Sequence, residues 1–553
     1  MQRSQLLRIL QSTSARRMST STQEYLVAKT SDLKDNEKKE VNVPGTEHKV
    51  LLIKQNDKYF ATSPKCTHYG APLVKGVLSE GRIVCPWHGA CFKISTGDIE
   101  DAPAIDPIIA FATSIKGESV FITAAEKDLA AGRRKPCKSA KAETDEHVVV
   151  IGGGAAGTTT AEGLREYGFK GKVTVISSEA HYPIDRTKLS KALITDASKI
   201  ALRDEAFYKD MDIDFQKGTT VKSVDIKDKF VALESGGKVS YSKLVLALGG
   251  TPKRLPMDGF KLDNVFVLRN IEHASEIVSA RGESKKNVVI IGSSFVGMEA
   301  AYANAKDHNV TVIGMEKYPL MNVLGEQIGK QLQASAEQAN IKLYMEAGVE
   351  KAIAEDGGKS ATHVVLKDGT KLPADLIILG VGVAPATKFL DGSGLQLEKD
   401  GGIEVDSYLQ VKGQADIYAV GDIAQFPYTG PGAEGKPIRI EHWDVAQNHG
   451  RAVAKTLAGK KEEFKNVPYF WSAQSGQLRY CGNNSPTVGW DDLIIQGSLE
   501  ESKFVGFYTK GDTVVAVVSM GYDPVVSKAS ELMRAGTMPN KKKLQDGLDI
   551  REL

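Results

Sequence analysis

The fold is decided by the stretch His147-Val-Val-Val-Ile-Gly152-Gly-Gly154-Ala-Ala-Gly157. Its hydrophobic run is typical of a buried strand, and its G-x-G-x-x-G spacing is typical of a tight turn that leads into a helix. The pattern returns as Asn287-Val-Val-Ile-Ile-Gly292-Ser-Ser294-Phe-Val-Gly297. Each copy continues into a Val-Thr-Val-Ile run and, three residues later, into a glutamate, Glu179 or Glu316. The sequence therefore predicts two βαβ units of the kind that binds a dinucleotide.

Each glycine turn is expected to place a pyrophosphate on the amides at the start of its helix, because only glycine lets the backbone approach that closely. A single G-x-G-x-x-G is a weak signal, but two copies inside hydrophobic βαβ units are a strong one. The residues concerned are Gly152, Gly154 and Gly157 in the first copy and Gly292, Ser294 and Gly297 in the second. Because Ser294 replaces the middle glycine, its side chain is expected to crowd the phosphates, so the second site is the less certain of the two.

Two loops nearer the N-terminus each contain one cysteine and one histidine. They are Cys66-Thr-His68-Tyr-Gly70-Ala-Pro-Leu73 and Cys85-Pro-Trp-His88-Gly89-Ala-Cys-Phe92. In a mixed-ligand [2Fe–2S] cluster two thiolates hold one iron and two neutral imidazoles hold the other, so one ligand of each kind per loop fits. Zinc is the competing interpretation, although zinc modules usually pair Cys with Cys and His with His.

Along their whole length these loops resemble the Rieske family motif CTHxGxxL and CPWHGxxF. The resemblance implies that the cluster ligands are Cys66, His68, Cys85 and His88. In respiratory members each loop has an extra cysteine, and the two form a disulfide; here Ala71 and Trp87 fill those places. The resemblance is therefore to the low-potential Rieske ferredoxins of oxygenase systems.

Composition limits the other possibilities. A chain of 553 residues predicts three or four domains, and a net charge of +2 gives no sign of a strongly basic nucleic-acid surface. No run of 18 apolar residues exists, so no membrane-spanning helix is expected. Of the five cysteines, two are the expected ligands. Cys91, Cys137 and Cys481 are expected to be reduced thiols, with Cys137 exposed in a linker.

Residues 1–22 have the composition of a mitochondrial transit peptide. They contain Arg3, Arg8, Arg16 and Arg17, several serines and threonines, and no acid. Arg17-Met18-Ser19 resembles a matrix-protease site. Mitochondrial import is the favoured interpretation. A disordered tail, with a start at Met18 and a cytosolic product, is the alternative.

From residue 147 to about 485 the sequence resembles the ferredoxin-reductase and apoptosis-inducing-factor branch of the two-dinucleotide flavoproteins. Two segments carry this resemblance, His181-Tyr-Pro-Ile-Asp-Arg186-Thr-Lys-Leu-Ser-Lys191 and Asp416-Ile-Tyr-Ala-Val-Gly421-Asp422. It implies FAD at the first site, with contacts from Gly152, Gly154, Gly157, Glu179, Arg186, Lys191, Gly421, Asp422 and Trp471. For Trp471, packing in the core is the alternative.

The second site is then expected to bind the nicotinamide cofactor. The residues expected to contact it are Gly292, Ser294, Gly297, Glu316 and Gly382. NADH is favoured over NADPH, because a glutamate at position 316 would bind ribose hydroxyls and repel the extra phosphate. Lys317 and Gly314 keep NADPH open, since a lysine tolerates a phosphate and many relatives place the acid at position 314.

The resemblance also implies the catalytic residues. Lys191 is expected to pair with Glu299 beside the flavin, and Phe295 is expected to gate the nicotinamide face. The alternative for Glu299 is a solvated charge on a helix. A disulfide reductase would need two cysteines just after the first repeat, and residues 181–191 contain none.

The expected fold is multidomain: an all-β Rieske domain, two Rossmann-like α/β domains and a C-terminal α+β domain. The expected boundaries are a transit peptide at 1–22, the Rieske domain at 23–124, a linker at 125–146, FAD-binding segments at 147–273 and 396–460, an NAD(P)H-binding domain at 274–395, and an interface domain at 461–553.

The leading hypothesis is an NADH oxidoreductase of the Rieske-bearing, apoptosis-inducing-factor-like type. Electrons would pass from NADH through FAD to the cluster and on to an unknown acceptor. One alternative is a signalling protein with a death-related role, whose cofactors regulate partner binding. Another is a dedicated electron donor to an oxygenase. The sequence does not name the acceptor, and a homodimer is possible on the resemblance alone.

Overall fold

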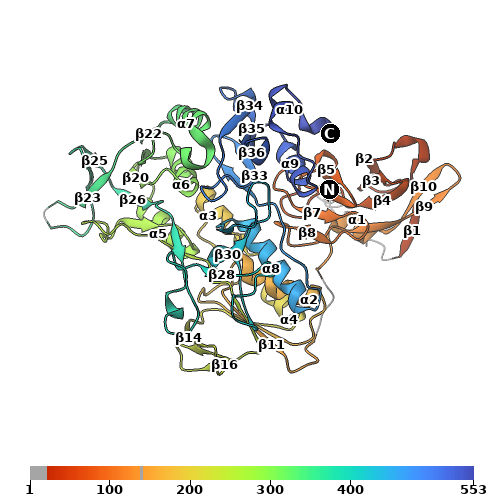
Figure 1. Cartoon of the computed structure of the whole chain (residues 1–553), viewed down its shortest axis with the longest axis horizontal. Helices are drawn as coiled ribbons and strands as arrows, with labels where there is room; N and C mark the ends of the chain where they lie inside the picture. Colours follow the sequence, from red (N-terminus) through yellow and green to blue (C-terminus); the bar gives the residue numbers. More distant parts are fainter. Residues whose placement is uncertain (1–20, 137–140, 356) are drawn as a thin grey trace, which may run out of the picture. The chain divides into compact units, whose positions relative to one another are not determined.

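The computed structural model describes residues 21–136, 141–355 and 357–553 (Figure 1). The expected transit peptide lies almost wholly outside these residues, and so does Cys137. The described chain divides into two compact units. The smaller contains residues up to 84, 91–100 and 106–135; the larger contains 85–90, 101–105 and 136–553. Within the described ranges, no helix is long and apolar enough to cross a membrane.

The smaller unit is built mainly from β-strands, as expected for the all-β domain at residues 23–124. An antiparallel sheet has the order β1-β10-β9-β4-β3-β2, and a second sheet has the order β5-β6-β7-β8. The first sheet contains β1 (Thr22–Lys29), β2 (Glu37–Asn42), β3 (Lys49–Gln55), β4 (Lys58–Thr62), β9 (Ala110–Lys116) and β10 (Ser119–Ala125). The second contains β5 (Val77–Ser79), β6 (Arg82–Val84), β7 (Cys91–Lys93) and β8 (Ile99–Asp101).

Part of the segment expected to be a linker, 125–146, is helical. Helix α1 spans Glu126–Ala131 and begins with two acids, Glu126 and Asp128, which interact favourably with a helix N-terminus. It ends at Gly132, which adopts a left-handed conformation with φ of +64°. Leu129 is buried, so this helix packs on the smaller unit rather than crossing solvent.

In the larger unit the first glycine motif lies in a parallel sheet of order β13-β12-β11-β17-β29. Its elements are β11 (His147–Ile151), α2 (Ala155–Glu166), β12 (Lys172–Ile176), α3 (Thr187–Ala192), α4 (Glu205–Asp210), β13 (Ile213–Gln216), β17 (Lys243–Leu246) and β29 (Ile417–Ala419). The chain therefore leaves this sheet after β17 and returns to its edge some 170 residues later. Small sheets attach to it, formed by β14 (Val221–Asp225), β15 (Phe230–Leu233) and β16 (Lys238–Ser240), and by β28 (Ile403–Glu404), β30 (Ala424–Pro427) and β31 (Pro437–Arg439).

The second glycine motif lies in an equivalent parallel sheet of order β19-β26-β20-β21-β22. Its elements are β19 (Val265–Val267), α5 (Ile271–Arg281), β20 (Asn287–Ile291), α6 (Phe295–Ala305), β21 (Asn309–Ile313), α7 (Met321–Gln338), β22 (Ile341–Tyr344) and β26 (Leu376–Leu379). Between β22 and β26 the chain forms a separate antiparallel sheet of β23 (Val349–Ile353), β24 (His363–Leu366) and β25 (Lys371–Pro373). Strand β19 precedes residue 274, so this sheet begins earlier than the expected boundary. The chain crosses between the two sheets at β18 (Gly250–Pro252) and β27 (Val383–Pro385), which pair antiparallel.

The C-terminal part is an antiparallel sheet of order β32-β33-β36-β35-β34. Its elements are β32 (Tyr469–Ala473), β33 (Gln477–Gly482), β34 (Asp492–Ser498), β35 (Lys503–Lys510), β36 (Thr513–Met520), α9 (Val525–Arg534) and α10 (Lys541–Gln545). Helix α8 (Trp443–Leu457) precedes this sheet in the chain and lies beside α2 (Figure 1). The two helices approach closely because Gly450 has no side chain: a Cβ there would lie 2.5 Å from the carbonyl oxygen of Ala156.

Candidate active site

The first glycine turn has the shape that a pyrophosphate requires. A Cβ on Gly152 would lie 2.1 Å from the carbonyl oxygen of Ala247, and one on Gly157 would lie 1.9 Å from the carbonyl oxygen of Gly152. These two glycines therefore let the strand, the turn and helix α2 meet. Gly154 differs, because nothing lies within 4 Å of its Cβ direction and no side chain caps α2. The amides at the start of α2 thus face open space, which fits the diphosphate of FAD.

The second turn repeats this geometry with one change. A Cβ on Gly292 would lie 2.4 Å from the carbonyl oxygen of Gly380. A Cβ on Gly297 would lie 2.1 Å from the carbonyl oxygen of Gly292. Ser294 turns its hydroxyl back onto the protein, where Oγ donates to the Gly380 carbonyl (2.9 Å) and accepts from the Gly297 amide (3.3 Å). In this arrangement the serine covers one helix amide while its hydroxyl stays bonded to the turn, and this is how the chain accommodates a side chain there.

The acids after the two repeats are held by neighbours. Glu179 forms an ion pair with Arg186 at 2.5 Å. Glu316 accepts hydrogen bonds from Ser293 Oγ at 2.7 Å and Asn322 Nδ2 at 3.2 Å. Each carboxylate lies past the end of its second strand, at the place where a ribose binds in a βαβ unit.

Gly421 and Asp422 follow β29 and so lie at the same sheet as the first glycine turn. The Gly421 amide donates to His449 Nδ1 at 3.1 Å, and its φ of +72° is one that glycine adopts without strain. The Asp422 carboxylate is 8% exposed and pairs with Arg269 at 2.7 Å. Gly382, at the crossover between the sheets, has φ of +90° and no atom within 4 Å of its Cβ direction.

The ion pair predicted between Lys191 and Glu299 is present, with a separation of 3.0 Å. Glu299 is 5% exposed, so it is a buried group and not a solvated helix charge. Its carboxylate also accepts hydrogen bonds from Ser472 Oγ (2.6 Å), the Ala473 amide (3.2 Å) and Ser190 Oγ. Helix α6 of the second sheet is thereby joined to α3 of the first and to β32 of the C-terminal domain.

Phe295 is the first residue of α6 and lies next to the aromatic side chains of the C-terminal domain. Its ring is 5.0 Å from that of Phe470, and Phe470 lies 4.6 Å from the ring of His442. His442 immediately precedes α8. This places the expected gating residue at the start of the helix that follows the second glycine turn.

The second Cys/His loop, 85–90, belongs to the larger unit. His88 is 6% exposed, and its ring centroid lies 4.4 Å from that of Trp471. Two carbonyls of the loop are held by the C-terminal domain: Arg479 Nε donates to Trp87 O at 2.6 Å, and Ser527 Oγ donates to Cys85 O at 2.8 Å. This ligand loop therefore belongs to the same compact unit as both glycine turns.

The first Cys/His loop belongs to the smaller unit. Its backbone closes on itself, since the Cys66 amide donates to Ala71 O (2.8 Å) and the Gly70 amide donates to Cys66 O (2.9 Å). The loop at Cys85 closes in the same way, with its amide 2.8 Å from Ala90 O. Cys66 is 2% exposed and Cys85 is 1% exposed, and neither forms a disulfide. Both loops thus offer buried thiols in matching turns, as the donor set of a Rieske cluster requires.

Three family models match the chain. Pyridine nucleotide-disulphide oxidoreductase covers residues 146–450, the Rieske [2Fe-2S] domain covers 23–113, and Reductase C-terminal covers 469–553. The chain belongs to the pyridine nucleotide-disulphide oxidoreductase family. Its Rieske-fused form makes it similar to apoptosis-inducing factor 3 of Homo sapiens, which is 41% identical over 94% of this chain and 86% of that protein.

Other relatives match the reductase part alone. Rhodocoxin reductase of Rhodococcus erythropolis is 31% identical over 71% of this chain and 90% of that protein. The crystal structure of the covalent putidaredoxin reductase–putidaredoxin complex superimposes with a TM-score of 0.69 at 28% identity, covering 74% of this chain and 98% of that chain. The protein is therefore an FAD-dependent NAD(P)H oxidoreductase of the ferredoxin-reductase type that carries a Rieske domain.

Burial sets the protonation states of three side chains at the start of α8 and within it. It lowers the pKa of His442 to about 4 and that of His449 to about 3, so both imidazoles are neutral at neutral pH. Burial raises the pKa of Asp444, in the first turn of α8, to about 8, and the nearby Asp101 carboxylate raises it further. One oxygen of Asp444 accepts from the Tyr469 amide at 3.0 Å.

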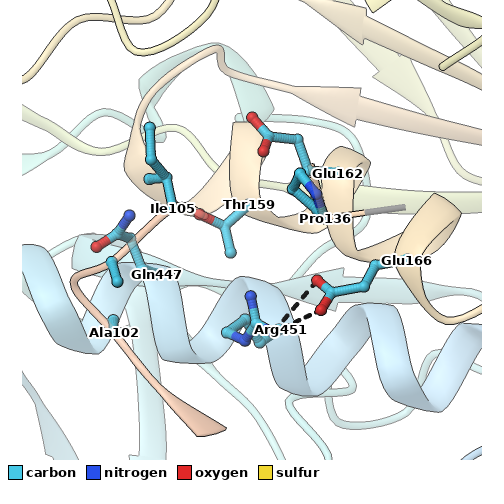
Figure 2. Close-up of a pocket in the computed structure, with 9 residues that line it drawn as sticks. Ala102, Ile105, Pro136, Thr159, Glu162, Glu166, Gln447 and Arg451 are labelled. Atoms are coloured by element: carbon cyan, nitrogen blue, oxygen red, sulfur yellow. Dashed lines mark hydrogen bonds and ion pairs between the residues drawn. The ribbon is translucent and has the colours of Figure 1, made fainter. Parts of the chain in front are cut away.

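The segment 101–105 also belongs to the larger unit (Figure 2). The Ala102 amide donates to Asn448 Oδ1 at 2.8 Å, and Arg203 donates to Ile105 O at 2.7 Å. A cavity of about 10 Å³ lies between this segment and helices α2 and α8, beside the buried Arg451–Glu166 ion pair. That volume suits one water molecule and excludes a cofactor.

Several residues of the site lay outside the sequence predictions. Ser190 and Ser472 bond Glu299, Arg269 pairs with Asp422, and Arg479 and Ser527 hold the second ligand loop. Ser190 could have been found, since it directly precedes Lys191 on the same helix. The others lie about 150 to 440 residues from their partners, and no local pattern marks them.

Proposed function

We propose that the protein takes a hydride from NADH onto FAD and passes single electrons from FAD to its own Rieske cluster, which then reduces a separate acceptor. The single observation that carries this proposal is the contact of His88 with Trp471. His88 is an expected ligand of the cluster, and Trp471 lies on β32 beside residues that bond Glu299. An expected cluster ligand therefore lies next to the strand that holds Glu299, within one compact unit.

The roles of the chain's residues follow from their contacts. FAD accepts a hydride and releases electrons singly, and the Rieske cluster carries one at a time. The amides of α2, with Gly421 and Asp422, would hold the dinucleotide, while Lys191 would direct an ammonium donor at the flavin. Glu299 holds that lysine in place and balances its charge. Phe295 and Phe470 would keep water from the face where the nicotinamide stacks.

The preference for NADH rests on the charges at the end of β21. Glu316 is held by Ser293 and Asn322, so its carboxylate is fixed where a 2′-phosphate would be repelled. Lys317, the residue that would tolerate the phosphate, forms an ion pair with Glu326 at 2.5 Å. Both observations favour NADH.

The test is an anaerobic stopped-flow experiment on the purified holoprotein with NADH and, separately, NADPH. Visible absorption follows the flavin, and EPR of freeze-quenched samples follows the cluster. Trp471→Leu is expected to leave flavin reduction near the wild-type rate and to slow cluster reduction by an order of magnitude or more. Trp490→Leu, at a tryptophan that packs on Tyr508 elsewhere in the same domain, is the matched control.

Two outcomes would count against the proposal. One is a flavin that is reduced by NADH while the cluster never is. The other is a Trp471→Leu protein whose cluster is reduced as fast as in the wild type. Faster flavin reduction by NADPH than by NADH would overturn the cofactor preference alone.

The proposal also places the protein in mitochondria, on the basis of the arginine-rich, acid-free residues 1–22. Fusing residues 1–22 to a fluorescent protein tests this. Import of the fusion supports the location, and a diffuse cytosolic signal contradicts it.

A further inference from the structure

The two expected histidine ligands have different surroundings. His88 is 6% exposed and faces Trp471. His68 is partly exposed and stacks on Tyr69, with ring centroids 3.7 Å apart and an interplanar angle of 19°. Tyr69 is itself 38% exposed. One imidazole is thus enclosed within the reductase unit, whereas the other lies against an aromatic ring that solvent reaches.

The exposed ring belongs to a loop that is fixed by its own hydrogen bonds. The Gly70 amide donates to Cys66 O at 2.9 Å, and the Leu73 amide donates to Pro64 O at 2.9 Å. Thr67, 3% exposed, donates from Oγ to Asp106 O at 2.5 Å. Tyr69 therefore stands on a rigid turn, and a partner that binds it would lose little conformational entropy from the loop.

Two lysines flank Tyr69 in the sequence of this turn. Lys65 pairs through its backbone with Pro72, and the Lys75 amide donates to Pro72 O at 3.1 Å, so both lysines belong to the same turn. Both side chains are exposed. Residues 61–79 contain these two lysines and no aspartate or glutamate. We call Lys65, Tyr69, Gly70 and Lys75 the exit patch. These four exposed residues carry two positive charges and one aromatic ring, and the acid nearest to them along the chain is the exposed Glu80.

We infer that electrons leave the cluster through His68, to a one-electron acceptor protein whose acidic surface docks on the exit patch. This inference rests on the proposed function, which supplies the electron through His88. Each event oxidises the cluster by one electron and reduces the acceptor by one, with no atom transferred. Two such events balance the two electrons of one NADH.

Complementary charge makes the partner's chemistry testable. Steering between an anionic protein and a cationic patch raises the association rate, and salt weakens it. Plastocyanin, an acidic one-electron carrier, and cytochrome c, a basic one, are suitable protein probes. Ferricyanide serves as a small acceptor that needs no protein docking surface.

The experiment mixes holoprotein, pre-reduced with NADH, with each acceptor in a stopped-flow instrument at several salt concentrations. With plastocyanin, the Lys65→Glu/Lys75→Glu variant is expected to lose about tenfold in second-order rate at low salt and to lose the wild-type salt dependence. Tyr69→Leu is expected to slow plastocyanin reduction at every salt concentration. The matched control, Lys34→Glu/Lys58→Glu, alters two exposed lysines of the same unit and keeps the wild-type rate.

Further measurements separate a failed inference from a failed function. The NADH-driven reduction of flavin and cluster, and the EPR spectrum of the cluster, are expected to be unchanged in the Lys65→Glu/Lys75→Glu variant and in the control. If the wild-type cluster is not reduced by NADH, the proposed function fails. If the cluster is reduced normally but the exit-patch and control variants behave alike, or cytochrome c is reduced faster than plastocyanin at low salt, the exit through His68 is wrong.

Discussion

Replacing Glu299 with glutamine tests how much the reductase depends on one buried carboxylate. One carboxylate oxygen accepts from Lys191, Ser472 Oγ and the Ala473 amide, and the other accepts from Ser190 Oγ and Lys191. Glutamine keeps the size and one acceptor oxygen. It replaces the second oxygen with an NH₂ group that faces donors, and it leaves the ammonium of Lys191 without its counter-charge.

The magnitude follows from burial. Breaking a buried ion pair by removing one partner costs about 3–5 kcal/mol. The Lys191 side chain is 23% exposed and can be partly rehydrated, so the lower end applies. We expect Glu299→Gln to lower the free energy of unfolding by about 3 kcal/mol, which is about 150-fold in the equilibrium constant.

The assay is a urea titration of the holoprotein, followed by the flavin fluorescence that appears when FAD is released. Glu326→Gln removes one partner of an exposed pair, Glu326 being 57% exposed, and is expected to cost less than about 1 kcal/mol. The reasoning is refuted if Glu299→Gln matches the wild type within the error of this control. Flavin reduction by NADH is expected to slow in Glu299→Gln alone, because only this variant changes the position of Lys191.

Two further predictions concern the glycine turn and a buried acid. Gly157→Ala is expected to prevent folding of the larger unit, because its Cβ would lie 1.9 Å from Gly152 O. Gly154→Ala has open space for its Cβ, so it is expected to fold and to lose FAD affinity. Equal soluble yields of the two variants would contradict this. Burial raises the pKa of Asp444 to about 8, whereas an aspartate in the unfolded chain ionises near pH 4. The folded protein therefore holds a proton on Asp444 that the unfolded chain loses between these two pH values. The contribution of this group to stability is complete below about pH 4 and is lost as the pH rises to about 8. Asp444→Asn is therefore expected to flatten the fall in urea midpoint between pH 5 and 8, and midpoints that fall in parallel with those of the wild type would refute this.

The sequence could predict those parts of the site that depend on contacts between near neighbours. Gly152 and Gly157 touch each other's backbone within one turn, so their spacing alone reveals the geometry. The same is true of the loop at Cys66, which closes on Ala71. In the C-terminal part, Lys510-Gly-Asp512 is a local turn signal of the same kind, and it joins β35 to β36.

The rest depends on contacts between residues far apart in the sequence. The Lys191–Glu299 pair was inferred from a resemblance, and nothing in the residues themselves indicates that serines 190 and 472 complete it. The effect of Ser294 could not be predicted from the sequence either. Whether a serine hydroxyl crowds a phosphate depends on its χ1 rotamer. Here the hydroxyl bonds Gly380 and the helix amide, a choice set by a strand that arrives 86 residues later.

The position of the second ligand loop changes how the fusion of the two domains is understood. Joining a ferredoxin to its reductase raises their effective concentration and removes the need for diffusional encounter. In this chain the loop that carries Cys85 and His88 has its carbonyls held by Arg479 and Ser527, which lie on β33 and α9 of the reductase's C-terminal domain. A tether alone would not require such contacts. They hold the ligand loop against the C-terminal domain, where the ring of His88 lies 4.4 Å from that of Trp471.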